Sequence, residues 1–129
     1  MPTAKCRVLC VDDHHDTSEM LELLLAREDY EVETAGTMED ACRLALSKQF
    51  DLYVLDRRLP DATGLELCEK LNEMTPGVPC IFYTGDAYEL HRKEAMAAGA
   101  SAYVAKPDID GLIDAVQKLL ANSECATTN

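Results

Sequence analysis

Short apolar runs and amphipathic stretches alternate along this chain. The apolar runs are about four residues long, rich in β-branched or aromatic side chains, and each ends at a polar residue; they are "VLCV" at 8–11, "LYVL" at 52–55, "CIFY" at 80–83 and "AYVA" at 102–105. Continuous runs of this kind are typical of strands that are buried on both faces of a parallel sheet. A fifth run, "EVETA" at 31–35, alternates instead, which predicts an edge strand with one solvated face.

Helical patterns fill the segments between these strands. They predict five helices, at 17–28, 37–48, 64–74, 87–98 and 109–121. We expect Thr17 or Ser18 to cap the first helix, Thr37 to cap the second and Gly99 to follow the fourth. Strands that alternate with helices imply an α/β fold, a parallel sheet with helices on both faces joined by right-handed crossovers.

Composition narrows the class of protein. A chain of 129 residues, 47% of them apolar, suits one domain with one core. Its formal net charge of −12 argues against direct contact with nucleic acid or with an anionic membrane surface. With no membrane-length apolar run and no signal-peptide core, the expected location is cytoplasmic. The six cysteines form no C-x-x-C pattern, so we expect buried, reduced thiols.

Polar side chains follow four of the predicted strands. They are Asp12 and Asp13 after the first strand, Asp56 after the third, Thr84 after the fourth and Lys106 after the fifth. The carboxyl ends of parallel strands share one edge, and ligands of open α/β sheets bind there. Each residue alone is common as a cap or turn residue, but their joint position favours a functional site.

The residue types indicate phosphoryl chemistry. Three neighbouring carboxylates repel one another unless a cation joins them, and oxygen ligands suit Mg²⁺. A lysine and a hydroxyl beside the metal would neutralise the oxygens of an incoming phosphoryl group. Asp56 is the candidate nucleophile, because an aspartate can form an aspartyl phosphate, and Asp12 and Asp13 are candidates for holding the metal.

Four motifs resemble the receiver domain of two-component response regulators. "VLCVDD" resembles the acidic pair after the first strand, and "LDRRLPDATG" resembles the phospho-acceptor segment D-x-x-[ML]-P-x-x-x-G. "FYTGDA" resembles the threonine-bearing strand end, and "GASAYVAKP" resembles the closing strand with its lysine-proline pair. The match covers about residues 6 to 121, with the motifs in the family's order and spacing.

The resemblance implies a flavodoxin-like, doubly wound fold with strand order 2-1-3-4-5. A receiver domain would occupy residues 1–121, and residues 122–129 would form a disordered tail. Asp56 would accept a phosphoryl group from the phosphohistidine of a histidine kinase or of a phosphotransfer protein. Mg²⁺ would be bound by Asp13, Asp56 and the backbone carbonyl of Arg58, with Asp12 acting mainly through water.

The resemblance also implies how the signal is read. Thr84 and Lys106 would hold phosphoryl oxygens, Tyr103 would swing inward as Thr84 moves, and the Lys106–Pro107 bond would be cis. Output would pass through the surface of helix four, strand five and helix five, to a downstream protein or to an output domain that this sequence does not include. Such a domain is a signalling switch and not an enzyme that turns over a small molecule.

Two details depart from the usual pattern. His14, His15 and Asp16 could mimic a transition-metal site, although adjacent histidines after a strand mostly face solvent or cap the loop. Arg58 and Asp86 could pair across the mouth of the pocket and alter the lifetime of the phosphoryl group.

Three alternatives stay open at this point. A haloacid-dehalogenase-like phosphohydrolase also uses a strand-end aspartate with Mg²⁺, but it has an acid two residues later, where this chain has Arg58. A flavin binder needs a phosphate loop rich in Ser, Thr and Gly after the first strand, and "DDHHD" would repel phosphate. A degenerate receiver would bind partners without phosphorylation, but the acidic and basic set described above is complete.

Overall fold

Strands and helices alternate strictly along the chain. The computed structural model describes residues 5–86 and 88–121. The strands are β1 (Arg7–Val11), β2 (Glu31–Ala35), β3 (Leu52–Leu55), β4 (Cys80–Thr84) and β5 (Ala102–Ala105). The helices are α1 (His15–Arg27), α2 (Met38–Ser47), α3 (Gly64–Met74), α4 (Glu89–Ala97) and α5 (Ile109–Leu120).

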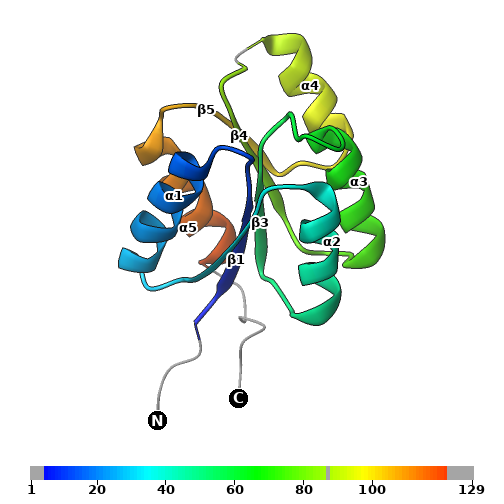
Figure 1. Cartoon of the computed structure of the whole chain (residues 1–129). Coiled ribbons are helices and arrows are strands. Elements are labelled where there is room, and N and C mark those ends of the chain that lie inside the picture. Colours follow the sequence, from blue (N-terminus) through cyan, green and yellow to red (C-terminus); the bar gives the residue numbers. More distant parts are fainter. Residues whose placement is uncertain (1–4, 87, 122–129) are drawn as a thin grey trace.

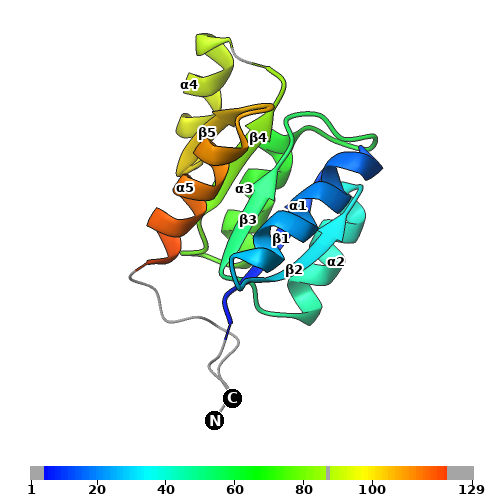
Figure 2. The same cartoon turned by 90° about the vertical axis from the view of Figure 1, so that its left-hand side faces the viewer.

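The five strands form one parallel sheet in the order β2-β1-β3-β4-β5, which confirms the expected doubly wound α/β fold. Helices α1 and α5 cover one face of the sheet, and α2, α3 and α4 lie on the other (Figures 1 and 2). In the register of the sheet, Val11 is level with Leu55, and Leu55 is level with Phe82. The residues that follow β1 and β3 therefore emerge side by side at one edge.

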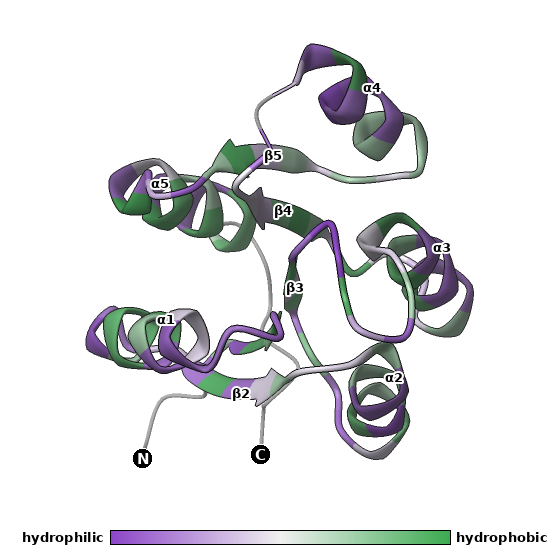
Figure 3. Ribbon diagram, turned by 45° about the horizontal axis from the view of Figure 1, so that its top comes forward, coloured by the Kyte–Doolittle hydropathy of each residue, from purple (hydrophilic) through white to green (hydrophobic). Residues whose placement is uncertain are grey.

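Two apolar cores, one on each face, hold the sheet between its helices. One contains Leu21 and Leu25 of α1 with Leu112 and Val116 of α5. The other contains residues of α2, α3 and α4 packed on β1, β3 and β4. The central strands are accordingly the most apolar part of the ribbon seen from the carboxyl ends in Figure 3.

One strand is less buried than its sequence indicated. All four residues of β5 are only partly buried, whereas β3 and β4 are buried throughout. The prediction that 102–105 is buried on both faces is wrong because β5, like β2, is an edge strand with a single neighbour, β4. The edge position predicted for 31–35 is confirmed.

The helix starts follow local capping. Helix α1 begins at His15 with His14 in the N-cap position, so the expectation of Thr17 or Ser18 as the cap is wrong. The hydroxyl of Ser18 instead donates to the backbone carbonyl of Asp12 at 3.2 Å. Thr37 caps α2 as expected, because its hydroxyl accepts from the backbone N–H of Asp40 at 3.1 Å.

The later helices end close to their predicted bounds. Gly99, with a φ of 109°, follows α4 in the left-handed conformation that glycine adopts readily. Asp108 caps α5 by accepting from the backbone N–H of Gly111 at 2.9 Å. Residue 87, where the fourth helix was expected to begin, lies outside the described residues, as do 122–129, the expected tail.

The cysteines differ in state. Cys10, Cys42, Cys68 and Cys80 are free thiols, and all but Cys42 are buried, as expected. Cys6 is disulfide-bonded, so the expectation of reduced thiols is wrong for that residue. Within the described ranges, no helix has the length and apolar character needed to cross a membrane.

Candidate functional site

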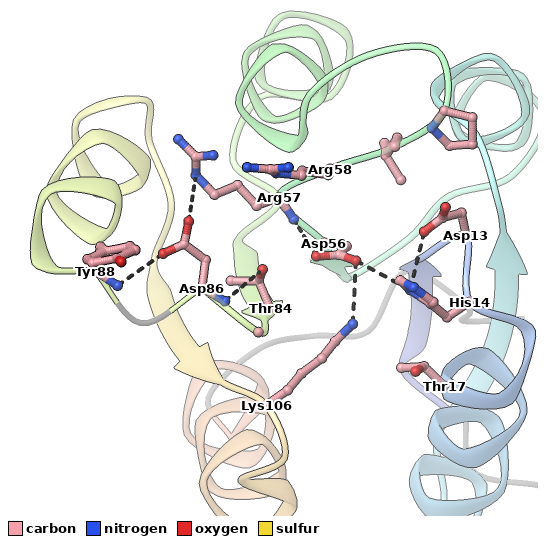
Figure 4. Close-up of a pocket in the computed structure, with 13 residues that line it drawn as sticks. Asp13, His14, Thr17, Asp56, Arg57, Arg58, Thr84, Asp86, Tyr88 and Lys106 are labelled. Carbon is pink, nitrogen blue, oxygen red and sulfur yellow. Dashed lines mark hydrogen bonds and ion pairs between the residues drawn. The ribbon is translucent and has the colours of Figure 1, made fainter.

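The polar residues that follow the strands come together at the carboxyl edge of the sheet. Asp12, Asp56 and Thr84 are exposed by only 4%, 7% and 4%, so the apolar strands carry them to the border of the core. Asp56 and Thr84 line a pocket of about 860 Å³, together with Asp13 and Lys106 (Figure 4). The structure therefore brings together the side chains that the sequence placed at separate strand ends.

Lys106 connects the two buried carboxylates. Its Nζ lies 2.7 Å from Oδ2 of Asp12 and 3.4 Å from Oδ2 of Asp56. Burial alone would lower the pKa of Lys106, but its hydrogen bond to Asp12 and the charges of Asp56 and Asp12 outweigh burial and raise it. The ammonium is thus held in its charged form beside both carboxylates. The Lys106–Pro107 peptide bond is cis, as predicted.

Asp12, Asp13, Asp56 and His14 form the cluster in which a metal ion could bind. One ligand atom of each residue lies within 4.8 Å of the corresponding atoms of the others. Three carboxylates face the single ammonium of Lys106, so the cluster carries an excess of negative charge. This oxygen-rich set fits a hard divalent cation such as Mg²⁺.

The loop from β3 to α3 fixes the orientation of Asp56. Its Oδ1 accepts the backbone N–H of Arg57 at 2.7 Å, and its own N–H donates to the carbonyl of Val11 at 2.9 Å. At the start of α3, a Cβ on Gly64 would lie 2.1 Å from the backbone carbonyl oxygen of Asp56. Only glycine therefore allows the helix to approach so closely behind the aspartate.

Thr84 and Tyr103 meet at the loop between β4 and α4. The hydroxyl of Thr84 accepts the backbone N–H of Asp86 at 3.4 Å. The hydroxyl of Tyr103 donates to the backbone carbonyl of Asp86 at 2.5 Å, and its ring stacks on Phe82 with centroids 6.0 Å apart. The tyrosine thus packs against the strand that carries Thr84 and bonds to the loop that follows it.

Asp86 pairs with a different arginine from the one the sequence suggested. Arg57 Nε lies 3.8 Å from Oδ2 of Asp86, and Arg57 Nη2 lies 3.3 Å from Oε1 of Glu94 in α4. Among the described residues Asp86 pairs with Arg57 and His91, and the exposed Arg58 forms no ion pair, so the predicted pair between Arg58 and Asp86 is wrong. Arg57, next in the chain after Asp56, leaves the loop on the side of β4 and α4 (Figure 4).

Sequence reasoning missed Arg57, and it also missed His91 of α4, whose ring pairs with Asp86. The pKa of Asp86 is lowered, first by the hydrogen bond from the backbone N–H of Tyr88, and then by His91 and Arg57. The acidic residues at 86 and 94, with a histidine between them, were the available signal for a basic partner. The sequence did not indicate which arginine would reach them.

The two histidines after the acidic pair differ. His15 is 84% exposed and pairs with Glu19 at 3.0 Å, so it faces solvent as expected. His14 instead turns its Nδ1 toward the carboxylates, 3.0 Å from Oδ1 of Asp12. The hydrogen bond with Asp12, followed by the charges of Asp12 and Asp13, raises the pKa of His14. Asp16 is not a member of this cluster.

The amino-acid sequence that forms this site matches a known family. A family model for the response regulator receiver domain matches residues 8–117. The chain belongs to this family. This membership rules out the haloacid-dehalogenase and flavin-binding alternatives. The chain is a signalling domain of a two-component system.

Curated relatives match most of this chain. The response regulator ArlR of Staphylococcus aureus is 33% identical over 115 residues, which make up 88% of this chain and 52% of that protein. The chain therefore spans about half the length of the curated relatives it matches.

Solved receiver structures superpose closely. The non-phosphorylated HemR receiver domain from Leptospira biflexa has a TM-score of 0.85 at 30% identity and covers 93% of this chain and 98% of its own. The response regulator protein TrrA from Thermotoga maritima, in complex with Mg(2+)-BeF, has a TM-score of 0.80 at 34% identity and covers 89% of this chain and 99% of its own.

Proposed function

We propose that this receiver domain is a phosphorylation-dependent switch in a two-component phosphorelay, with Asp56 as the phosphoryl acceptor. The observation that carries the proposal is the position of the Asp56 carboxylate. It is almost fully buried, it lines an open pocket, and it lies 3.4 Å from the ammonium of Lys106 and in one cluster with the acidic pair after β1. A buried carboxylate held beside a fixed cation is suited to attack a phosphorus atom.

The transfer needs a donor with a labile phosphoryl group, and the phosphohistidine of a histidine kinase or of a phosphotransfer protein has one. An oxygen of Asp56 forms a bond to phosphorus while the bond from phosphorus to the histidine nitrogen breaks. The released imidazole then takes up a proton. Lys106 neutralises charge on the phosphoryl oxygens throughout, because its Nζ is already 3.4 Å from the acceptor carboxylate.

A metal ion would bind in the cluster beside the acceptor. Asp13, Asp56 and the backbone carbonyl of Arg58 would be direct ligands of Mg²⁺, and Asp12, already bonded to Lys106, would act through water. When bound, Mg²⁺ supplies positive charge for the phosphoryl oxygens. The excess of carboxylates over ammonium groups supports this assignment, as does the Mg(2+)-BeF complex named for TrrA.

The signal would travel through Thr84 and Tyr103. A phosphoryl group adds a charge of about −1.5 to −2 and three acceptor oxygens, which would draw the hydroxyl of Thr84 away from the N–H of Asp86. Tyr103 already bonds to the carbonyl of Asp86, so a shift of this loop alters its position directly. The surface formed by α4, β5 and α5 would then change its partner.

The partners follow from this role. The donor is a histidine kinase or a phosphotransfer protein, and the receiver of the signal is a downstream protein or an output domain. We infer cytoplasmic action, since the donors of such relays work there, and no direct contact of this acidic chain with nucleic acid or with a membrane.

The test is the intact mass of the protein after incubation with Mg²⁺ and a small phosphodonor such as phosphoramidate. We expect a gain of one phosphoryl group that requires Mg²⁺ and is absent from Asp56→Asn. Asp51→Asn, a carboxylate on the loop before β3, is the matched control and should still gain the group. If Asp56→Asn gains it as readily as the wild type, or if the wild type gains nothing, the chain is not a switch of this kind.

A further inference from the structure

His14 is placed by the helix that follows the acidic pair. It occupies the N-cap position of α1, and its backbone N–H donates to Oδ1 of Asp12 at 2.8 Å. Its side chain makes no capping hydrogen bond to the helix, and 68% of it is exposed. The imidazole therefore contributes neither to the core nor to the helix end, and its contacts are with the carboxylates, the shortest being Nδ1 to Oδ1 of Asp12 at 3.0 Å.

The spacing around Nδ1 of His14 is that of a coordination sphere. Nδ1 lies 3.0 Å from Oδ1 of Asp12, 3.3 Å from Oδ1 of Asp13 and 4.0 Å from Oδ2 of Asp56. Around an octahedral ion with ligands at about 2.1 Å, neighbouring ligand atoms are about 3.0 Å apart and opposite ones about 4.2 Å apart. The nitrogen thus stands near neighbour distance from Asp13 and near opposite distance from Asp56, the two side chains proposed as direct ligands of the ion.

We propose that His14 is a nitrogen ligand of the divalent cation held by Asp13 and Asp56, and that it shifts the metal preference of this site from Mg²⁺ toward ions that favour imidazole. The inference rests on the metal site of the proposed function and adds a ligand to it. Mg²⁺ prefers oxygen ligands, whereas imidazole suits ions such as Ni²⁺ and Zn²⁺. Binding through Nδ1 leaves Nε2 of the exposed ring free to donate to water.

A rival account makes the opposite prediction. His14 could serve as a charged counter-ion that neutralises the carboxylates and occupies the position of a metal. Its removal would then strengthen the binding of every divalent cation, because a competing positive charge would be lost. The two roles of His14, ligand or competitor, are therefore distinguished by whether its removal weakens or strengthens the binding of divalent cations.

The experiment compares Ni²⁺ and Mg²⁺ binding, measured by calorimetry, in the wild type, His14→Ala and His14→Asn. We expect either substitution to lower the affinity for Ni²⁺ relative to Mg²⁺ by at least about tenfold, since lost support of a metal site costs about 10- to 100-fold. His14→Asn, which presents an amide oxygen instead of the nitrogen, should retain Mg²⁺ binding better than Ni²⁺ binding. His15→Ala is the matched control, because His15 is exposed beside Glu19, and it should leave the ratio unchanged.

Proton NMR of the Ni²⁺ form gives a direct readout of ligation. The chain has three histidines, so the ring resonances of a bound imidazole, shifted by the paramagnetic ion, can be assigned by substitution. These resonances should vanish in His14→Ala and persist in His15→Ala. An unchanged ratio of affinities, or tighter binding of both ions to His14→Ala, would overturn the assignment of His14 as a ligand.

The two proposals fail separately. If the wild type gains a phosphoryl group on Asp56 but the ratio does not depend on His14, only the ligand assignment is wrong. If the ratio depends on His14 but no phosphoryl group is gained, the site is a metal site and the switch proposal is wrong.

Discussion

Replacement of Gly64 by alanine should damage both the stability of the fold and the phospho-acceptor. The added Cβ would lie 2.1 Å from the carbonyl oxygen of Asp56, 2.9 Å from the ring of Phe82 and 3.0 Å from Cα of Arg57. Two of these contacts are with backbone, so the start of α3 or the end of β3 must move by about 1 Å. Overpacking typically costs about 1 to 3 kcal/mol and occasionally more, and the two backbone contacts place Gly64→Ala at the upper end of this range, above the gain of about 1 kcal/mol that alanine brings to a helix.

Urea unfolding measures this prediction. We expect Gly64→Ala to lose about 2 to 3 kcal/mol of unfolding free energy, a large part of the 5–15 kcal/mol typical of a domain, with a slower gain of the phosphoryl group. Gly36→Ala is the matched control, because its Cβ would meet only the carbonyl of Asp12 at 4.0 Å. Stability of Gly64→Ala within about 0.5 kcal/mol of the wild type would refute the steric argument.

Three further predictions concern the charges around the site. Lys106→Met leaves the carboxylate of Asp12 without its partner at 2.7 Å. Urea unfolding should therefore show a loss of about 2 kcal/mol of unfolding free energy without metal, and Mg²⁺ should stabilise the variant more than the wild type. Equal stabilisation of both proteins by Mg²⁺ would count against the pairing. Asp86 has a lowered pKa in the folded state, so its contribution to the stability of the fold is complete above pH 3.8 and is lost as the pH falls through the pKa of the folded protein. The difference in urea midpoint between the wild type and Asp86→Asn should therefore vanish in acid and persist in base. Arg57→Ala removes the ion pair that ties Glu94 of α4 to the loop after β3, so hydrogen exchange over Glu89–Ala97 should accelerate roughly fivefold, corresponding to about 1 kcal/mol. Arg58→Ala should leave the exchange rate unchanged.

The sequence predicted the elements whose information is local. The bounds of β2, β3, β5 and α3 coincide with the runs at 31–35, 52–55, 102–105 and 64–74. These segments carry their pattern and their caps within a few residues. In α3, for example, Thr63 and Glu66 form a reciprocal capping box, with Glu66 N–H to Thr63 Oγ1 at 3.1 Å.

The errors arose where a residue's surroundings depend on distant parts of the chain. The apolar run of β5 looks like that of β3, and only the order of strands makes one an edge and the other a centre. Arg57 and Arg58 are adjacent and chemically identical, and the positions of Asp86 after β4 and of Glu94 in α4 decide which of them is bound. The position of His14 near Asp56 likewise depends on the packing of α1 against β1 and β2 and on the pairing of β1 with β3, and no spacing in the sequence states it.

The identity of the phosphorylated residue tests the central claim most directly. After incubation with Mg²⁺ and phosphoramidate, borohydride reduction converts an aspartyl phosphate into homoserine, and the masses of the digested peptides that contain Asp12, Asp13, Asp56 and Asp61 locate it. The account predicts homoserine at position 56, dependent on Mg²⁺, with Asp12, Asp13 and Asp61 unmodified. Homoserine at any of those three positions instead, or none at all, would contradict it.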